Sequence, residues 1–132
     1  MEANRSFPAD VTSPRAARQF VGSVIGHPED ESTQMALVLT SELVTNAVLH
    51  ARTEVDVRIE FDGGCLRVEV TDGDPRLPAA VPQRPGALDG RGLFLVEQLA
   101  SKWGSDRRNG GKVVWFTLAT GAEPRAKVGA GG

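Results

Sequence analysis

The sequence has few of the features that would assign it to a specialised class. It contains a single cysteine, Cys65, and no apolar run near the roughly 20 residues that a membrane-spanning helix needs. A lone cysteine can neither form an internal disulfide nor complete a zinc cluster, so we interpret Cys65 as a small strand residue without a redox role. The first residues contain Arg5 but no apolar segment behind it. We therefore expect no secretory signal, no membrane partner and a cytoplasmic location.

The charge pattern also excludes a class of partner. The net charge is −2, and no long block of lysine and arginine occurs. The nearest approach is the segment 102–112, whose cations are separated by glycine and aspartate, and we interpret it as a solvated turn. A protein with this charge pattern is not expected to bind nucleic acid as its main function.

The length and composition predict one globular domain. A chain of 132 residues with 40% hydrophobic residues can bury one well-formed core. We assign residues 1–119 to that domain and treat the Gly/Ala-rich residues 120–132 as a disordered tail. Residues 74–89 lie in a long stretch that is rich in proline and has no periodicity. Loops of this length in a compact domain are usually functional lids or disordered segments, and we expect a lid.

Periodicity and turn residues predict the order of the elements. Ser13 is the expected N-cap of the first helix and Pro14 its first helical residue, and Gly26 and Pro28 would end it. Three helices on one face of a mostly antiparallel, mixed sheet would make a two-layer α/β (α+β) sandwich. The predicted elements are a strand over 4–8, a helix from 12, a helix from about 28–30 to His50, strands over 55–61 and 66–72, a helix over 90–99, a strand from about 103 and a strand over 113–118.

Two polar residues interrupt the apolar stripe of the second predicted helix. Glu42 and Asn46 are four residues apart, so both project from one helix face, and His50 continues the same line. An amide oxygen is a hard ligand that suits magnesium, and a carboxylate can polarise a nucleophile. The alternative is an ordinary polar stripe that faces solvent.

An acidic residue ends the second strand of the predicted hairpin. Asp72 stands where a charge is costly unless it is paired, and its carboxylate could accept the exocyclic amine of adenine. The alternative is a simple turn made by Asp72 and Gly73.

A glycine pair marks the start of the third predicted helix, in the segment Gly90-Arg91-Gly92-Leu93. Glycines there leave backbone N–H groups open to an anion, and the helix dipole favours negative charge. Arg91, and Arg84 from the loop, could add contacts to phosphate. Neither a P-loop nor a Rossmann fingerprint is present.

The order and spacing of four segments resemble the successive boxes of the GHKL (Bergerat-fold) ATPases. The resemblance is closest to the small anti-sigma regulatory factors with serine/threonine protein kinase activity, and it covers about residues 5–119. The four segments are Glu-Leu-Val-Thr-Asn-Ala at 42–47, Asp-Gly-Asp-Pro at 72–75, Gly-Arg-Gly-Leu at 90–93 and Gly-Lys-Val-Val-Trp-Phe at 111–116.

This resemblance implies a role for each matching residue. Glu42 would be the general base, Asn46 would hold Mg²⁺ against the phosphates of ATP, and Asp72 would bind adenine. The glycines Gly90 and Gly92 would wrap the phosphates at the end of the lid. The other residues that we expect to contact the nucleotide are Gly73, Arg84, Arg91, Leu93 and Lys112.

The sequence departs from the family pattern in two places. The usual Asp-x-Gly-x-Gly box reads Asp72-Gly73-Asp74-Pro75-Arg76, so neither family glycine is in place. Lys112 stands where the last box usually has a small hydroxyl residue, and it could reach a phosphate or face solvent. Both departures put phosphoryl transfer in more doubt than nucleotide binding.

The resemblance implies an ATP- and Mg²⁺-dependent regulatory kinase. Such a protein would bind a sigma factor and phosphorylate a serine or threonine of an anti-anti-sigma partner, and relatives commonly form homodimers. The first alternative is a non-catalytic module whose lid reports ATP to a partner protein. The second is a structural domain with a decayed site.

Overall fold

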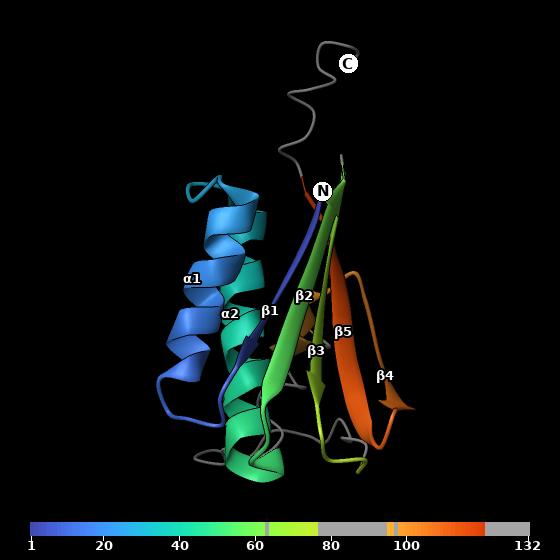
Figure 1. The fold of residues 1–132 in the computed structure, drawn as a ribbon. Coiled ribbons are helices and arrows are strands. Elements are labelled where there is room, and N and C mark those ends of the chain that lie inside the picture. Colours follow the sequence, from blue (N-terminus) through green and yellow to red (C-terminus); the bar gives the residue numbers. More distant parts are fainter. Residues whose placement is uncertain (63, 77–94, 97, 121–132) are drawn as a thin grey trace.

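The computed structural model describes residues 1–62, 64–76, 95–96 and 98–120. The described chain has two layers, with two helices against one face of a five-stranded sheet (Figure 1). This arrangement confirms the expected α+β sandwich. Its elements are β1 (Glu2–Phe7), α1 (Ser13–Ile25), α2 (Glu31–Asn46), the π-helical turn η1 (Ala47–Ala51), β2 (Val55–Asp62), β3 (Cys65–Asp72), β4 (Lys102–Arg108) and β5 (Gly111–Ala119).

The strands are ordered β1-β2-β3-β5-β4 across the sheet. Each of the four pairings is antiparallel, so the sheet of the described strands is wholly antiparallel rather than mixed. β3 and β5 are distant in sequence but are direct neighbours in the sheet, and Asp72 lies opposite Lys112 in their register. The end of β3 therefore meets the beginning of β5.

The strands alternate as their sequences predict. Val55, Val57 and Ile59 are fully buried on the face that the helices cover, while Arg58 and Glu60 pair with each other on the opposite face. Burying each large apolar side chain stabilises the fold by about 1.5–3 kcal/mol. The buried residues that β3 and β5 add to this core are Leu66, Val68, Val70, Val114, Phe116 and Leu118.

The first helix packs as expected but begins differently. Its buried stripe includes Phe20, Val21 and Ile25, and Gly26 ends it in the left-handed conformation with φ 75°. The prediction that Ser13 caps the helix is wrong, because Thr12 occupies the N-cap position. The buried Ser13 hydroxyl instead donates a hydrogen bond to the Pro8 carbonyl at 2.6 Å, which anchors the helix to the chain after β1.

Only part of the third predicted helix lies in the described residues. Residues 95–96 and 98–99 are helical, and Val96 is fully buried in the core. The start of this helix, most of the expected lid and the tail from residue 121 lie outside the described residues. Cys65 lies in a strand as predicted, but it is exposed. Among the described helices, none is long and apolar enough to cross a membrane.

Candidate functional site

The end of α2 carries the first pair of predicted site residues. Glu42 and Asn46 lie on successive turns and are half-buried, while Leu43 and Val44 between them pack into the core. No hydrogen bond joins the Asn46 side-chain amide to another described residue. The amide therefore lies at the border of the core with its hydrogen-bonding groups available to a ligand.

The helix changes its winding directly after Asn46. The predicted α-helix to His50 is wrong over its last turn, because residues 47–51 form a π-helical turn. It closes with a hydrogen bond from the Arg52 N–H to the Ala47 carbonyl at 3.0 Å, and Arg52 has φ 58°. Single π-helical turns of this kind are rare in proteins, and many of those that occur lie at functional sites.

Three elements bring the other described site residues to the same end of the molecule. The C-terminal end of α2, the end of β3 and the turn between β4 and β5 all lie at the lower end in Figure 1. α2 packs against both β3 and β5. Asp72 shares a strand face with Val68 and Val70, and Lys112 shares one with Val114 and Phe116, all four being core residues. Both charged residues are thus on the helix-covered side of the sheet.

Asp72 is a buried carboxylate with two hydrogen bonds and an ion pair. The residue is 7% exposed. Its Oδ1 accepts from the Lys112 ammonium at 3.0 Å and from the Asp74 N–H at 2.8 Å. Its Oδ2 lies 2.9 Å from the same ammonium. Asp72 therefore both shapes the turn that follows β3 and forms a buried ion pair.

Lys112 points into the site rather than into solvent. Its side chain is 12% exposed, and its ammonium also donates to the Asp74 carbonyl at 3.3 Å. Removing one partner of a buried ion pair leaves an uncompensated charge and costs about 3–5 kcal/mol. The position that departs from the family pattern is therefore tied to the expected adenine-binding carboxylate.

Two glycines near Asp72 lie close to other groups. A Cβ on Gly111 would lie 2.0 Å from the Asp72 carbonyl oxygen, and one on Gly73 would lie 3.1 Å from Cγ2 of Thr53. The Gly73 N–H donates to Oγ1 of Thr53 at 2.8 Å. The sequence reasoning missed Thr53, since a threonine before a strand carries no signal of a contact with Gly73.

The residues that replace the family glycines form a tethered turn. Oδ1 of Asp74 accepts a hydrogen bond from the Arg76 N–H at 3.0 Å, and the two side chains form an ion pair at 2.6 Å. These hydrogen bonds from Arg76 hold the pKa of Asp74 well below its ordinary value. Arg107 of β4 donates to the Pro75 carbonyl at 3.1 Å. The turn is thus fastened to the β4–β5 hairpin.

The remaining predicted contacts lie outside the described residues. These are Arg84, Gly90, Arg91, Gly92 and Leu93. The structure therefore brings together Asp72, Gly73 and Lys112, and places Glu42 and Asn46 on the helix that packs beside them.

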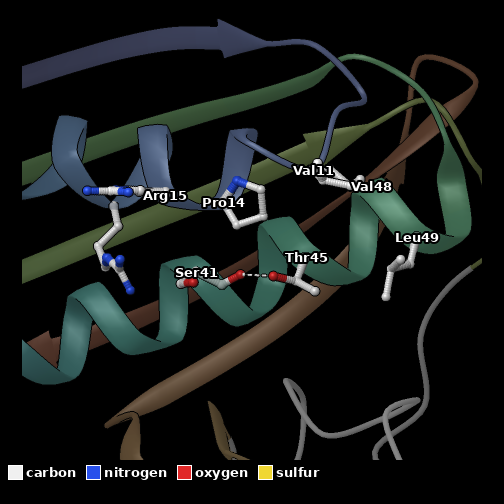
Figure 2. Close-up of a pocket in the computed structure, with 8 residues that line it drawn as sticks. Val11, Pro14, Arg15, Ser41, Thr45, Val48 and Leu49 are labelled. Carbon is white, nitrogen blue, oxygen red and sulfur yellow. Dashed lines mark hydrogen bonds between the residues drawn. The ribbon is translucent and has the colours of Figure 1, made fainter.

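A separate pocket lies between the start of α1 and the end of α2 (Figure 2). It has a volume of about 300 Å³. Thr45 faces it and donates a hydrogen bond to the Ser41 carbonyl at 2.7 Å. None of the predicted site residues lines this pocket, whose lining residues are Val11, Pro14, Arg15, Arg18, Ser41, Thr45, Val48 and Leu49.

The fold resembles that of a solved structure. The crystal structure of the RsbU and RsbW domains of Rv1364c from Mycobacterium tuberculosis superimposes with a TM-score of 0.70 at 19% sequence identity. The match covers 91% of this chain and 32% of that chain, so this protein spans about a third of the solved structure. At this identity the likeness is one of fold.

Sequence comparisons connect the chain to relatives more directly. An uncharacterised protein of Streptomyces coelicolor is 37% identical over 79 residues, which cover 56% of this chain and 75% of that protein. The family model described as the histidine kinase-like ATPase domain matches residues 7–118. That match includes both residues of the buried ion pair and the whole of α2. The chain therefore belongs to the family of histidine kinase-like ATPase domains.

Proposed function

We propose that this protein is an ATP-binding regulator of the anti-sigma type. In this proposal it transfers the γ-phosphoryl group of ATP to a serine or threonine of an anti-anti-sigma partner. The observation that carries the proposal is the placement of Glu42 and Asn46 on one face of α2, at the end of the molecule where β3 brings in Asp72. Glu42 and Asn46 lie on α2, which packs against β3, the strand that carries Asp72.

The described residues fit Mg²⁺ and a nucleotide. The amide oxygen of Asn46 is a hard ligand of the kind that Mg²⁺ accepts beside substrate phosphates, and it has no partner among the described residues. The buried Asp72 supplies an acceptor for the amine of a base. Gly90, Arg91, Gly92, Leu93 and Arg84 remain proposed phosphate contacts, as the resemblance implies.

The chain's own residues supply positioning and a base. Bound ATP with Mg²⁺ supplies an activated phosphoryl group. Phosphoryl transfer needs mainly the alignment of the nucleophile and neutralisation of charge. Glu42 would accept the proton from the partner's hydroxyl as the new oxygen–phosphorus bond forms, while the bond from the γ-phosphorus to the β–γ bridging oxygen breaks and ADP leaves. Asn46, one turn later on the same face, would hold Mg²⁺ against the phosphates of ATP.

The proposal of protein partners is based on the resemblance and is supported by the solved neighbour. The M. tuberculosis protein carries an RsbU and an RsbW domain in one chain, which supports a regulatory setting with protein partners. We propose a sigma factor and an anti-anti-sigma factor as the partners, a homodimer as the assembly and the cytoplasm as the location.

Transfer of radiolabelled phosphate from ATP to candidate anti-anti-sigma proteins tests the proposal. Wild type should label a partner, and Glu42→Gln should lower the rate by about 100-fold or more while it still binds ATP. Glu31→Gln is the matched control, because Glu31 is exposed at the opposite end of α2. Failure of wild type to label any such partner would contradict the kinase.

The second candidate is a non-catalytic module that reports ATP to a partner. The Asp72–Lys112 ion pair and the tethered turn over residues 74–76 favour it, because both restrict the part of the site where base and lid meet. This candidate predicts ATP-dependent partner binding without phosphate transfer. A pull-down of candidate partners with and without ATP separates the two functions.

A further inference from the structure

Asp72 and Lys112 already bind each other and the turn after β3 within the protein. Lys112 donates hydrogen bonds to Oδ1 of Asp72 and to the Asp74 carbonyl, and its ammonium also forms an ion pair with Oδ2 of Asp72. A carboxylate has about four acceptor positions, two on each oxygen. The two positions of Oδ1 accept from Lys112 and from the Asp74 N–H. Only Oδ2 remains for a ligand, and the Lys112 ammonium already lies 2.9 Å from it.

The exocyclic amine of adenine would need the same acceptor that Lys112 uses. Both groups are hydrogen-bond donors, so the ammonium and the amine compete for the carboxylate rather than assist each other. The ammonium also carries a full charge, and charge-assisted hydrogen bonds are about twice as strong as neutral ones. With the pair almost fully buried, solvent does little to weaken this competition.

The strand register fixes the competitor in place. Lys112 lies directly opposite Asp72 in the β3–β5 pairing, and both side chains point to the helix-covered face. Gly111 lets the Asp72 backbone approach so closely that no other residue fits there. The ion pair is therefore part of the sheet, and it would be present before any nucleotide arrives.

We propose that Lys112 determines nucleotide affinity and selectivity by competing with the amine of adenine for Asp72. This inference rests on the proposed function, since it assumes that ATP binds with its base at Asp72. Wild type would then gain little from the exocyclic amine. It would bind a purine nucleotide that lacks this amine almost as well as ATP.

Calorimetric titration with ATP and with purine riboside triphosphate, which lacks the exocyclic amine, tests the inference. Wild type should bind the two ligands with affinities within about threefold of each other. Lys112→Thr places a small hydroxyl at the position and should bind ATP about tenfold more tightly, with purine riboside triphosphate little changed. Lys102→Thr, at the exposed start of β4, is the matched control and should behave as wild type.

Each outcome separates this inference from the proposed function. Equal or weaker ATP binding by Lys112→Thr, or an equal gain for both ligands, would overturn the inference and leave ATP binding intact. If wild type bound ATP more than about tenfold more tightly than purine riboside triphosphate, the inference would also be overturned, even if Lys112→Thr did not fold. If folded wild type and folded Lys112→Thr bound neither ligand, the proposed function would fail and the inference with it.

Discussion

Gly111 lies so close to the backbone of Asp72 that a side chain has no room between them. A Cβ at Gly111 would lie only 2.0 Å from the Asp72 carbonyl oxygen and 2.9 Å from Cα of Gly73. Real Cβ atoms essentially never come this close to backbone. The glycine therefore lets β5 begin beside the end of β3, which is what places Lys112 opposite Asp72.

Replacing Gly111 by alanine should separate the ends of β3 and β5. The clash is with backbone and cannot be relieved by rotating a side chain, so we expect a loss of about 1–3 kcal/mol in the free energy of unfolding. Gly64→Ala is the control, because nothing lies within 4 Å of a Cβ there, and it should change stability by less than about 0.5 kcal/mol. Urea unfolding measures both. Similar stabilities for the two variants would contradict this account of Gly111.

The carboxyl of Asp74 should titrate at a lower pH than an ordinary aspartate. Hydrogen bonds from Arg76 lower the pKa of Asp74 below its ordinary value of 3.8. A carboxyl whose pKa is lower in the folded state stabilises the fold above its unfolded pKa, and this contribution is lost as pH falls through the folded pKa. NMR titration of Asp74 should give a midpoint below 3.8, and Arg76→Gln should move the midpoint upward. An unchanged midpoint in the variant would show that Arg76 does not cause the shift.

Glu69 should stabilise the sheet face that the helices leave uncovered. Its residue exposure is 8%, and its carboxylate lies 3.0 Å from Arg67, 3.6 Å from Arg108 and 3.8 Å from Arg58. Glu69→Gln should lower the free energy of unfolding by about 1–3 kcal/mol, because three arginines lose a shared counter-ion.

Glu60 provides the control for that change. It also pairs with Arg58 but is 42% exposed, so Glu60→Gln should cost no more than about 1 kcal/mol. Thermal and urea unfolding compare the two variants. Equal costs would mean that burial does not distinguish Glu69 from an ordinary surface pair.

The buried hydroxyl of Thr40 should lower the free energy of unfolding of the wild-type protein. Its side chain is fully buried in α2, and its hydroxyl has no hydrogen-bond partner among the described residues. An isosteric Thr40→Val should therefore raise the free energy of unfolding by about 1 kcal/mol. Thr45→Val should give no such gain, since the Thr45 hydroxyl donates to the Ser41 carbonyl. If Thr40→Val were destabilising, the hydroxyl would have a role that its present environment does not explain.

The fold was predictable because its signals are local. The alternation of Val55, Val57 and Ile59 with polar residues indicated a half-covered strand, and the glycines after Asp62 indicated the hairpin. Those patterns depend on residues close in sequence. The stretch beyond Asn46 was not predictable in the same way, because the choice between α- and π-helical winding depends on how the end of α2 packs.

The sequence proposes the residues of the candidate site but could not predict their contacts. Glu42, Asn46 and Asp72 follow from the order of the four boxes. The partner of Lys112 does not, because β3 and β5 are paired across a long segment of chain and their register decides which residues meet. The same holds for Thr53 and Gly73, which come together only when the chain before β2 folds against the end of β3.

Calorimetric titration of wild type and Asn46→Ala with ATP in the presence of Mg²⁺ tests the central claim most directly. We expect saturable binding by wild type and no measurable binding by Asn46→Ala. Thr45→Ala, whose side chain faces the separate pocket, should bind ATP within about threefold of wild type. Absence of binding by folded wild type, or undiminished binding by folded Asn46→Ala, would contradict an ATP site built on the end of α2.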